Sequence, residues 1–75
     1  MGDSKIGRRA AEELLRIASE EDITLTEAYA EIETASSCFW RWQHGQSAPS
    51  APTLARMARF GYDVLYILTG ERSQA

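Results

Sequence analysis

Helix start and stop signals follow one another closely between Thr24 and Gly70, so this part of the chain has room only for short helices. Thr24 and Glu27 have the Thr-x-x-Glu spacing of a capping box, in which each side chain bonds a free backbone amide at a helix start. Gly45, Gly61 and Gly70 each follow an apolar segment, in the place where glycine commonly ends a helix. We therefore expect a chain of short helices.

Apolar periodicity and these signals predict five helices in an all-α domain. The first begins after a cap at Asp3 or Ser4 and ends near Ser19, because the three acidic residues at 20–22 oppose the helix dipole. The others cover about 24–32, 36–45, 50–61 and 63–70, with a turn at 33–35 and a loop at 46–52. The helical core is about 4–70 of a single domain, 1–75, and residues 71–75 are expected to fray.

The inward and outward residues of these helices follow from their spacing. In the first helix an apolar stripe is expected inside and four glutamates are expected to be solvated. The stripe is Ile6, Ala10, Leu14 and Ile17, and the glutamates are Glu12, Glu13, Glu20 and Glu21. In the third helix, Phe39 and Trp42 are expected in the core and Ser36 or Ser37 is expected to cap the helix.

The composition allows a folded domain and limits its chemistry. Hydrophobic residues make up 44% of the 75-residue chain, which is enough for one core, and no apolar run approaches the roughly 18 residues of a membrane span. Residues 1–9 have no apolar run typical of a secretory signal. Cys38 is the only cysteine and is expected as a small buried residue. A small domain without disulfides fits a reducing cytoplasm. One Cys and one His do not make a four-ligand zinc site, so neither a metal nor another cofactor is expected.

Charge is unevenly distributed along the chain. Residues 1–34 contain four Lys and Arg against nine Asp and Glu, whereas residues 35–75 contain four Arg against two acidic residues. The formal net charge is −3, which argues mildly against a nucleic-acid partner, because neutralising phosphate supplies much of such affinity. The excess of positive charge in the second half reduces the force of that argument.

The second and third predicted helices, joined at 33–35, have the outline of a helix-turn-helix, whose second helix enters the DNA major groove. The chain resembles the Cro/repressor-type helix-turn-helix family, which includes lambdoid phage repressors and many small bacterial regulators. The resemblance covers about residues 5–72. It rests on Ile-Thr-x-x-Glu at 23–27, Arg-Trp-x-x-Gly at 41–45, Pro49, Thr53-Leu54, and the block 61–70, which looks especially like small phage and prophage regulators. It implies a lambda repressor-like domain. Three residues depart from the family pattern: Glu33 replaces the usual turn glycine, Thr34 the usual apolar turn residue, and Trp40 a small polar one.

The resemblance also implies DNA contacts at particular positions. The base-contacting positions are Ser36, Ser37 and Arg41, the phosphate-contacting positions are Thr24, His44 and Gln46, and Ala35 and Trp40 are contacts of uncertain type. Arginine can bind guanine through two hydrogen bonds, and serine bonds bases with little preference.

Several alternatives remain open at these positions. Arg41 is either a base contact or half of a surface ion pair with a glutamate of the second helix. Trp40 either touches DNA or anchors a protein interface, where exposed tryptophan is enriched. His44 either contacts phosphate or is merely solvated.

The apolar segment at 64–68 is expected to pack one face on the core and to offer the other for a two-fold dimer contact. The candidate dimer residues are Val64, Leu65, Ile67 and Leu68. The first hypothesis for function is a sequence-specific transcriptional regulator, a phage or prophage repressor, binding double-stranded DNA at a pseudo-palindromic operator as a homodimer. The second is a helix-turn-helix fold that binds a protein partner, as an antirepressor, antitoxin-like protein or inhibitor. Neither a membrane partner nor enzyme activity is expected.

Overall fold

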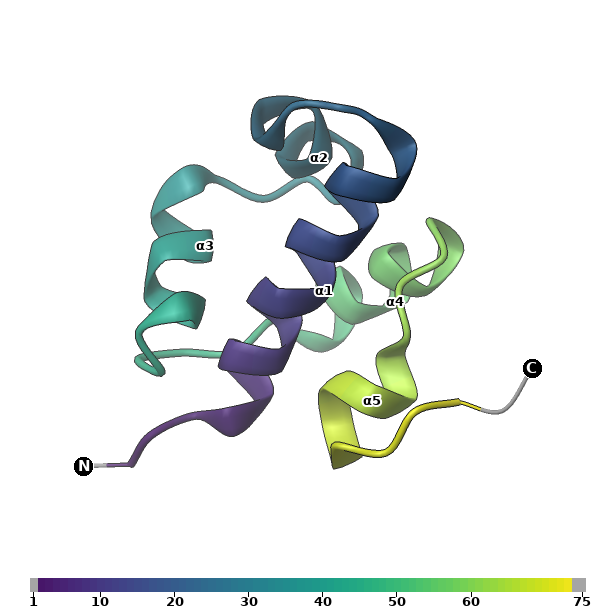
Figure 1. Ribbon diagram of the computed structural model, residues 1–75. Helices are drawn as coiled ribbons and strands as arrows, with labels where there is room; N and C mark the ends of the chain where they lie inside the picture. Colours follow the sequence, from purple (N-terminus) through teal and green to yellow (C-terminus); the bar gives the residue numbers. More distant parts are fainter. Residues whose placement is uncertain (1, 74–75) are drawn as a thin grey trace.

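The computed structural model describes residues 2–73, and in this part of the chain all regular secondary structure is α-helical (Figure 1). The helices are α1 (Lys5–Glu21), α2 (Leu25–Glu31), α3 (Ser36–Gln43), α4 (Ala51–Arg59) and α5 (Val64–Thr69). The prediction of five helices in an all-α fold is confirmed. Over residues 2–73, no helix has both the length and the apolar character needed to cross a membrane.

Helix α1 lies at the centre of the fold and packs against α2, α3 and α5 (Figure 1). Its apolar stripe is buried as predicted, with Ala10, Leu14 and Ile17 in the core and Ile6 partly buried. The remaining helices and turns each add large side chains to the same core: Ile32, Phe39, Trp42, Met57, Tyr62 and Ile67. Helix α1 therefore determines where α3 sits.

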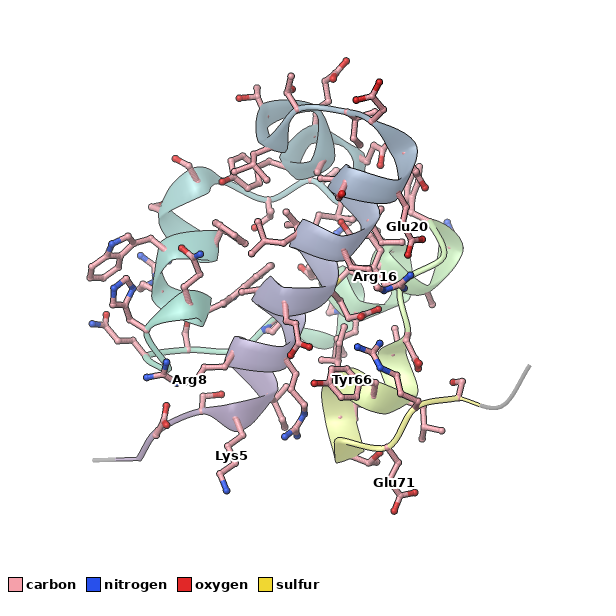
Figure 2. All side chains as sticks on the ribbon, in the orientation of Figure 1. Lys5, Arg8, Arg16, Glu20, Tyr66 and Glu71 are labelled. Atoms are coloured by element: carbon pink, nitrogen blue, oxygen red, sulfur yellow. The ribbon has the colours of Figure 1, made fainter. Side chains whose placement is uncertain are left out.

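Helix α1 begins at its Ser4 cap but ends two residues later than predicted. The acidic residues at its end do not stop the helix at Ser19, because Arg16 donates to the Glu20 carboxylate at 3.0 Å, one turn away (Figure 2). Such i,i+4 pairs stabilise a helix and offset the unfavourable dipole interaction. The helix ends instead at Glu21, and its C-cap, Asp22, adopts the left-handed conformation with φ of 55°.

Helices α2 and α3 are joined by the turn expected between them. The capping box is confirmed: the Glu27 amide donates to the Thr24 hydroxyl at 3.1 Å, and the Thr24 amide donates to the Glu27 carboxylate at 2.8 Å. In the turn, Glu33 has φ of 56°, the left-handed conformation that favours glycine. The residue before α3 is the extended Ala35, so neither Ser36 nor Ser37 caps this helix; both already lie in its first turn.

The start of α1 holds the end of α3 in place. The Ser4 amide donates to the Gly45 carbonyl at 2.9 Å, and Arg8 donates to the Gln43 carbonyl at 3.0 Å. Gly7 allows the loop after α3 to pass close to α1, because a Cβ at this position would overlap the Ser47 carbonyl. These contacts fix the C-terminal end of α3 against the start of α1.

Two expectations are wrong, one about the exposure of Glu13 and one about the C-terminal tail. Glu13 is completely buried rather than solvated, because α1 carries it into the junction with the segment that precedes α5. Its carboxylate accepts from Arg16 at 2.8 and 2.9 Å and from the Asp63 amide at 2.9 Å. Residues 71–73 are also not frayed, since Arg72 bonds Glu13 and Ser73 bonds Asp63. The last two residues of the expected tail, 74–75, lie outside the described residues.

Candidate nucleic-acid interface

One side of α3 faces away from the core and contains most of the predicted contact residues. Phe39 and Trp42 are buried, as predicted, and this fixes which side of the helix points outward. The exposed residues, called the α3 face below, are Ser36, Ser37, Trp40, Arg41, Gln43 and His44. Ala35, just before the helix, and Gln46, just after Gly45, are also exposed. The structure therefore brings the predicted base-contacting residues together on one convex surface.

Five of the six residues of the α3 face, all except Gln43, fall in two rows of side chains, because residues four apart lie one above the other on a helix. One row is polar and contains Ser37 and Arg41. The other runs from Ser36 through Trp40 to His44 and is largely aromatic. An aromatic row next to a polar one offers a bound partner both apolar contact and hydrogen bonds.

Trp40 and His44 form a stacked pair. Their ring centroids are 4.0 Å apart and their planes differ by 27°. His44 Nδ1 lies 2.8 Å from the Trp40 carbonyl oxygen, and since a carbonyl only accepts, this nitrogen must bear the proton. Among residues 2–73 the second ring nitrogen makes no hydrogen bond, so it can accept one from a partner. The i,i+4 spacing of the two rings is the sequence signal for this pair, which was not predicted.

Arg41 has no carboxylate partner among residues 2–73, so the ion pair with an α2 glutamate does not form. Its guanidinium donates to the Cys38 sulfur at 3.5 Å, and most of its donors remain available. The pKa of the Cys38 thiol is below its usual value because Thr34 bonds the sulfur; the Ala35 backbone and the positive charge of Arg41 add to this effect. Cys38 is partly exposed rather than buried.

The predicted phosphate contacts fall into two separate groups. Helix α2 lies at the top of Figure 1 and α3 along its left side, so Thr24, which precedes α2, belongs to another part of the surface than His44 and Gln46, which follow α3. The Thr24 amide and hydroxyl are both used in the capping box, and Glu27 places a negative charge beside them. This arrangement is unfavourable for a phosphate. His44 and Gln46 have no carboxylate neighbour in the sequence, but the Asp3 carboxylate, paired with Arg8, lies beside Gly45 between them.

Charge around the α3 face favours an anionic partner. No Asp or Glu occurs between Ala35 and Tyr62. Arg8 lies beside the C-terminal end of α3 (Figure 2), although Asp3 accepts from it at 2.6 Å and reduces its effect. At the other end of α3, Glu33 is paired with Arg56 at 3.2 Å. Asp3 and Glu33 therefore flank the two ends of α3, and each is paired with an arginine.

The four candidate dimer residues of α5 do not share one surface. Ile67 is completely buried and Val64 packs against the same core, because the i,i+3 face of α5 turns toward α1 and α4. Ile67 is therefore not available to a partner, and this prediction is wrong for that residue. Leu65 and Leu68 are 46% and 45% exposed, and only these two keep their side chains largely on the outside of α5.

Comparisons of the chain with models of protein families, with curated proteins and with solved structures found no match. Residues 2–73 contain no pocket and no group of three or more His, Cys, Asp and Glu side chains arranged as metal ligands. The α3 face is the surface on which most of the predicted DNA-contacting residues gather.

Proposed function

We propose that the protein is a sequence-specific DNA-binding regulator in which α2 and α3 form a helix-turn-helix and α3 enters the major groove. The observation that carries this proposal is the pairing of an inward face, Phe39 and Trp42, with an outward face on which Arg41 has no acidic partner among the described residues. An unpaired guanidinium on an exposed helix can bind guanine O6 and N7 together. The serines at the start of α3 lie in the same surface.

The proposal extends to the assembly and the biological role. A homodimer, with Leu65 and Leu68 at its contact, would place two α3 helices about 34 Å apart on a pseudo-palindromic operator. The overall arrangement would be that of a lambda repressor-like domain, and the role that of a small phage or prophage repressor acting in the cytoplasm. The acidic first half would keep non-specific binding weak and its salt dependence shallow.

Selection of bound fragments from random DNA, near physiological salt, tests this function. The expected result is an enriched inverted repeat whose half-sites lie one helical turn apart, about 10 base pairs. An enriched single site without symmetry would keep the DNA-binding function and remove the dimer. No enrichment, from a sample whose circular dichroism shows the expected helices, would remove the DNA-binding function.

A second candidate function is supported by one observation, the exposure of Trp40. Its side chain is 51% exposed, and exposed tryptophan is enriched among residues that dominate protein–protein binding energies. A helix-turn-helix that binds a protein partner would use this ring as an anchor. Substituting Trp40→Ala discriminates between the two functions: capture of a protein partner would be lost while DNA affinity stayed nearly unchanged.

A further inference from the structure

We propose that Trp40 is a specificity-determining residue that contacts the 5-methyl group of a thymine in the major groove, next to the base bound by Arg41. This inference rests on the DNA-binding function proposed above. The thymine methyl is the apolar group that a base pair displays in the major groove, and apolar side chains are its usual partners. Trp40 is the large apolar side chain of the α3 face.

The geometry of the Trp40–His44 pair prepares the indole for such a contact. Stacking at 4.0 Å restrains the indole on one side, and the 2.8 Å contact to the Trp40 carbonyl holds the imidazole in turn. A side chain already held in one orientation loses little rotamer freedom when it binds. The exposed part of the indole is thus an apolar surface supported on one side by the imidazole.

The position of Trp40 relative to Arg41 indicates where the methyl group would lie. Consecutive residues of a helix are about 100° apart around its axis and about 1.5 Å apart along it. Both side chains are exposed on the same turn of α3, so neighbouring base pairs are the expected targets of the two residues. The expected target is a thymine adjacent to the guanine that Arg41 binds.

Charge complementarity favours DNA over a protein as the partner of this ring. The residues around it on the α3 face are serine, glutamine, arginine and histidine, and no acidic residue occurs from Ala35 to Tyr62. A protein partner would have to be acidic to complement Arg41, whereas DNA supplies negative charge at every phosphate. The uncharged indole of Trp40 then contacts an apolar group of a base.

Replacing thymine by uracil in the selected operator tests the contact, because uracil lacks the 5-methyl group and keeps the same hydrogen-bonding edge. For the wild-type protein, one such replacement per half-site is expected to weaken binding about fourfold, the change that corresponds to exposing one methyl-sized group. For Trp40→Ala, the same replacement is expected to have no effect. Trp40→Phe, which keeps an apolar ring, should retain part of the sensitivity.

The outcomes separate this inference from the function on which it rests. Specific binding in which wild type and Trp40→Ala respond alike to every uracil replacement would overturn the role of Trp40 and leave the DNA-binding function in place. Failure of the wild type to bind any sequence specifically would overturn both. Capture of an acidic protein partner by the wild type but not by Trp40→Ala, with unchanged DNA affinity, would assign the ring to a protein interface instead. Because the side chain is half exposed, the variant should fold, and its thermal unfolding provides the control.

Discussion

Arg72 Nη1 lies 2.6 Å from Glu13 Oε2, although the two residues are 59 positions apart in the sequence. Glu13 is completely buried, and its other contacts come from Arg16 and the Asp63 amide. Arg72 also lies over the Tyr66 ring, 3.7 Å from its centroid. One carboxylate of α1 therefore joins α5 and the segment after it to the centre of the fold.

Substituting Glu13→Gln should lower the free energy of unfolding by about 2 kcal/mol, because Arg16 and Arg72 lose the buried charge with which they pair. The loss is smaller than for a fully buried ion pair, since both arginines remain partly solvated. Urea unfolding followed by circular dichroism at neutral pH measures the change. The matched control is Glu20→Gln, which removes the other carboxylate bound by Arg16 but from an exposed position, and should cost less than about 0.5 kcal/mol. Equal losses in the two variants would contradict the structural role of Glu13.

Acid should destabilise the protein through the same carboxylate. Burial alone would raise the pKa of Glu13, but hydrogen bonds from Arg16, Arg72 and the Asp63 amide outweigh it, and the pKa lies below the usual 4.5. The unfolded chain therefore takes up this proton first, so the stabilisation is complete above about pH 4.5 and is lost as the pH falls through the lower value of the folded state.

The measurement is the urea midpoint between about pH 6 and pH 3, where the wild type should decline and Glu13→Gln should decline less. Part of the decline should remain in the variant, because the pKa of Asp63 is also lowered, chiefly by the Ser73 and Tyr66 amides. Parallel curves for the two proteins would show that Glu13 is not the group responsible.

These contacts mark the limit of what the sequence could predict. Helix starts such as Thr24 and Ser4, and the inward stripe of α1, depend on neighbours within one or two turns, and they were predicted correctly. The burial of Glu13 depends on Arg72 and Asp63, which lie 59 and 50 positions away, and no local pattern contains that information. The order of residues 71–73 depends on the same distant contacts, so the sequence predicted a frayed tail there.

The candidate site shows the same division between local and distant determinants. Arg41 and the serines of α3 could be placed on an exposed face because Phe39 and Trp42 indicate the inward side. The stacking of Trp40 on His44 was also local and was simply not recognised. The burial of Ile67 depends on how α5 docks against α1, which the apolar segment at 64–68 cannot reveal by itself.

Tyr62→Phe should leave the free energy of unfolding unchanged or raise it by up to about 1 kcal/mol, because the buried Tyr62 hydroxyl has no hydrogen-bond partner among the described residues. The variant should also resist alkali better. Burial, and then the charges of Glu31, Glu21 and Glu13, raise the pKa of Tyr62 to about 12 from the usual 10.0. The folded protein thus favours the neutral phenol, and stability should fall as the pH rises from about 10 to about 12. Thermal unfolding across this range should show a decline in the wild type that is smaller in the variant.

Glu33→Gly should stabilise the turn before α3 by about 0.5–1 kcal/mol, since glycine adopts positive φ without the steric cost that a Cβ brings. The loss of the exposed ion pair with Arg56 should subtract little from this gain. Glu33→Gln is the control: it removes the ion pair and keeps the strained backbone, so no gain is expected. A similar gain from both variants would mean that charge, rather than the backbone, limits this turn.

Arg41→Ala should weaken binding to the selected operator by about 1–3 kcal/mol per half-site, with the loss concentrated at one base pair, because the guanidinium supplies two directional hydrogen bonds to guanine. Arg41→Lys keeps the charge and loses the paired geometry, so it should restore phosphate attraction without restoring discrimination at that base pair. Arg59→Ala removes an exposed arginine of α4, outside the α3 face, and serves as the matched control with a small and sequence-independent effect. Titrations against the operator and its single-base variants separate these cases, since a uniform loss over all sequences for Arg41→Ala would make this residue a phosphate contact.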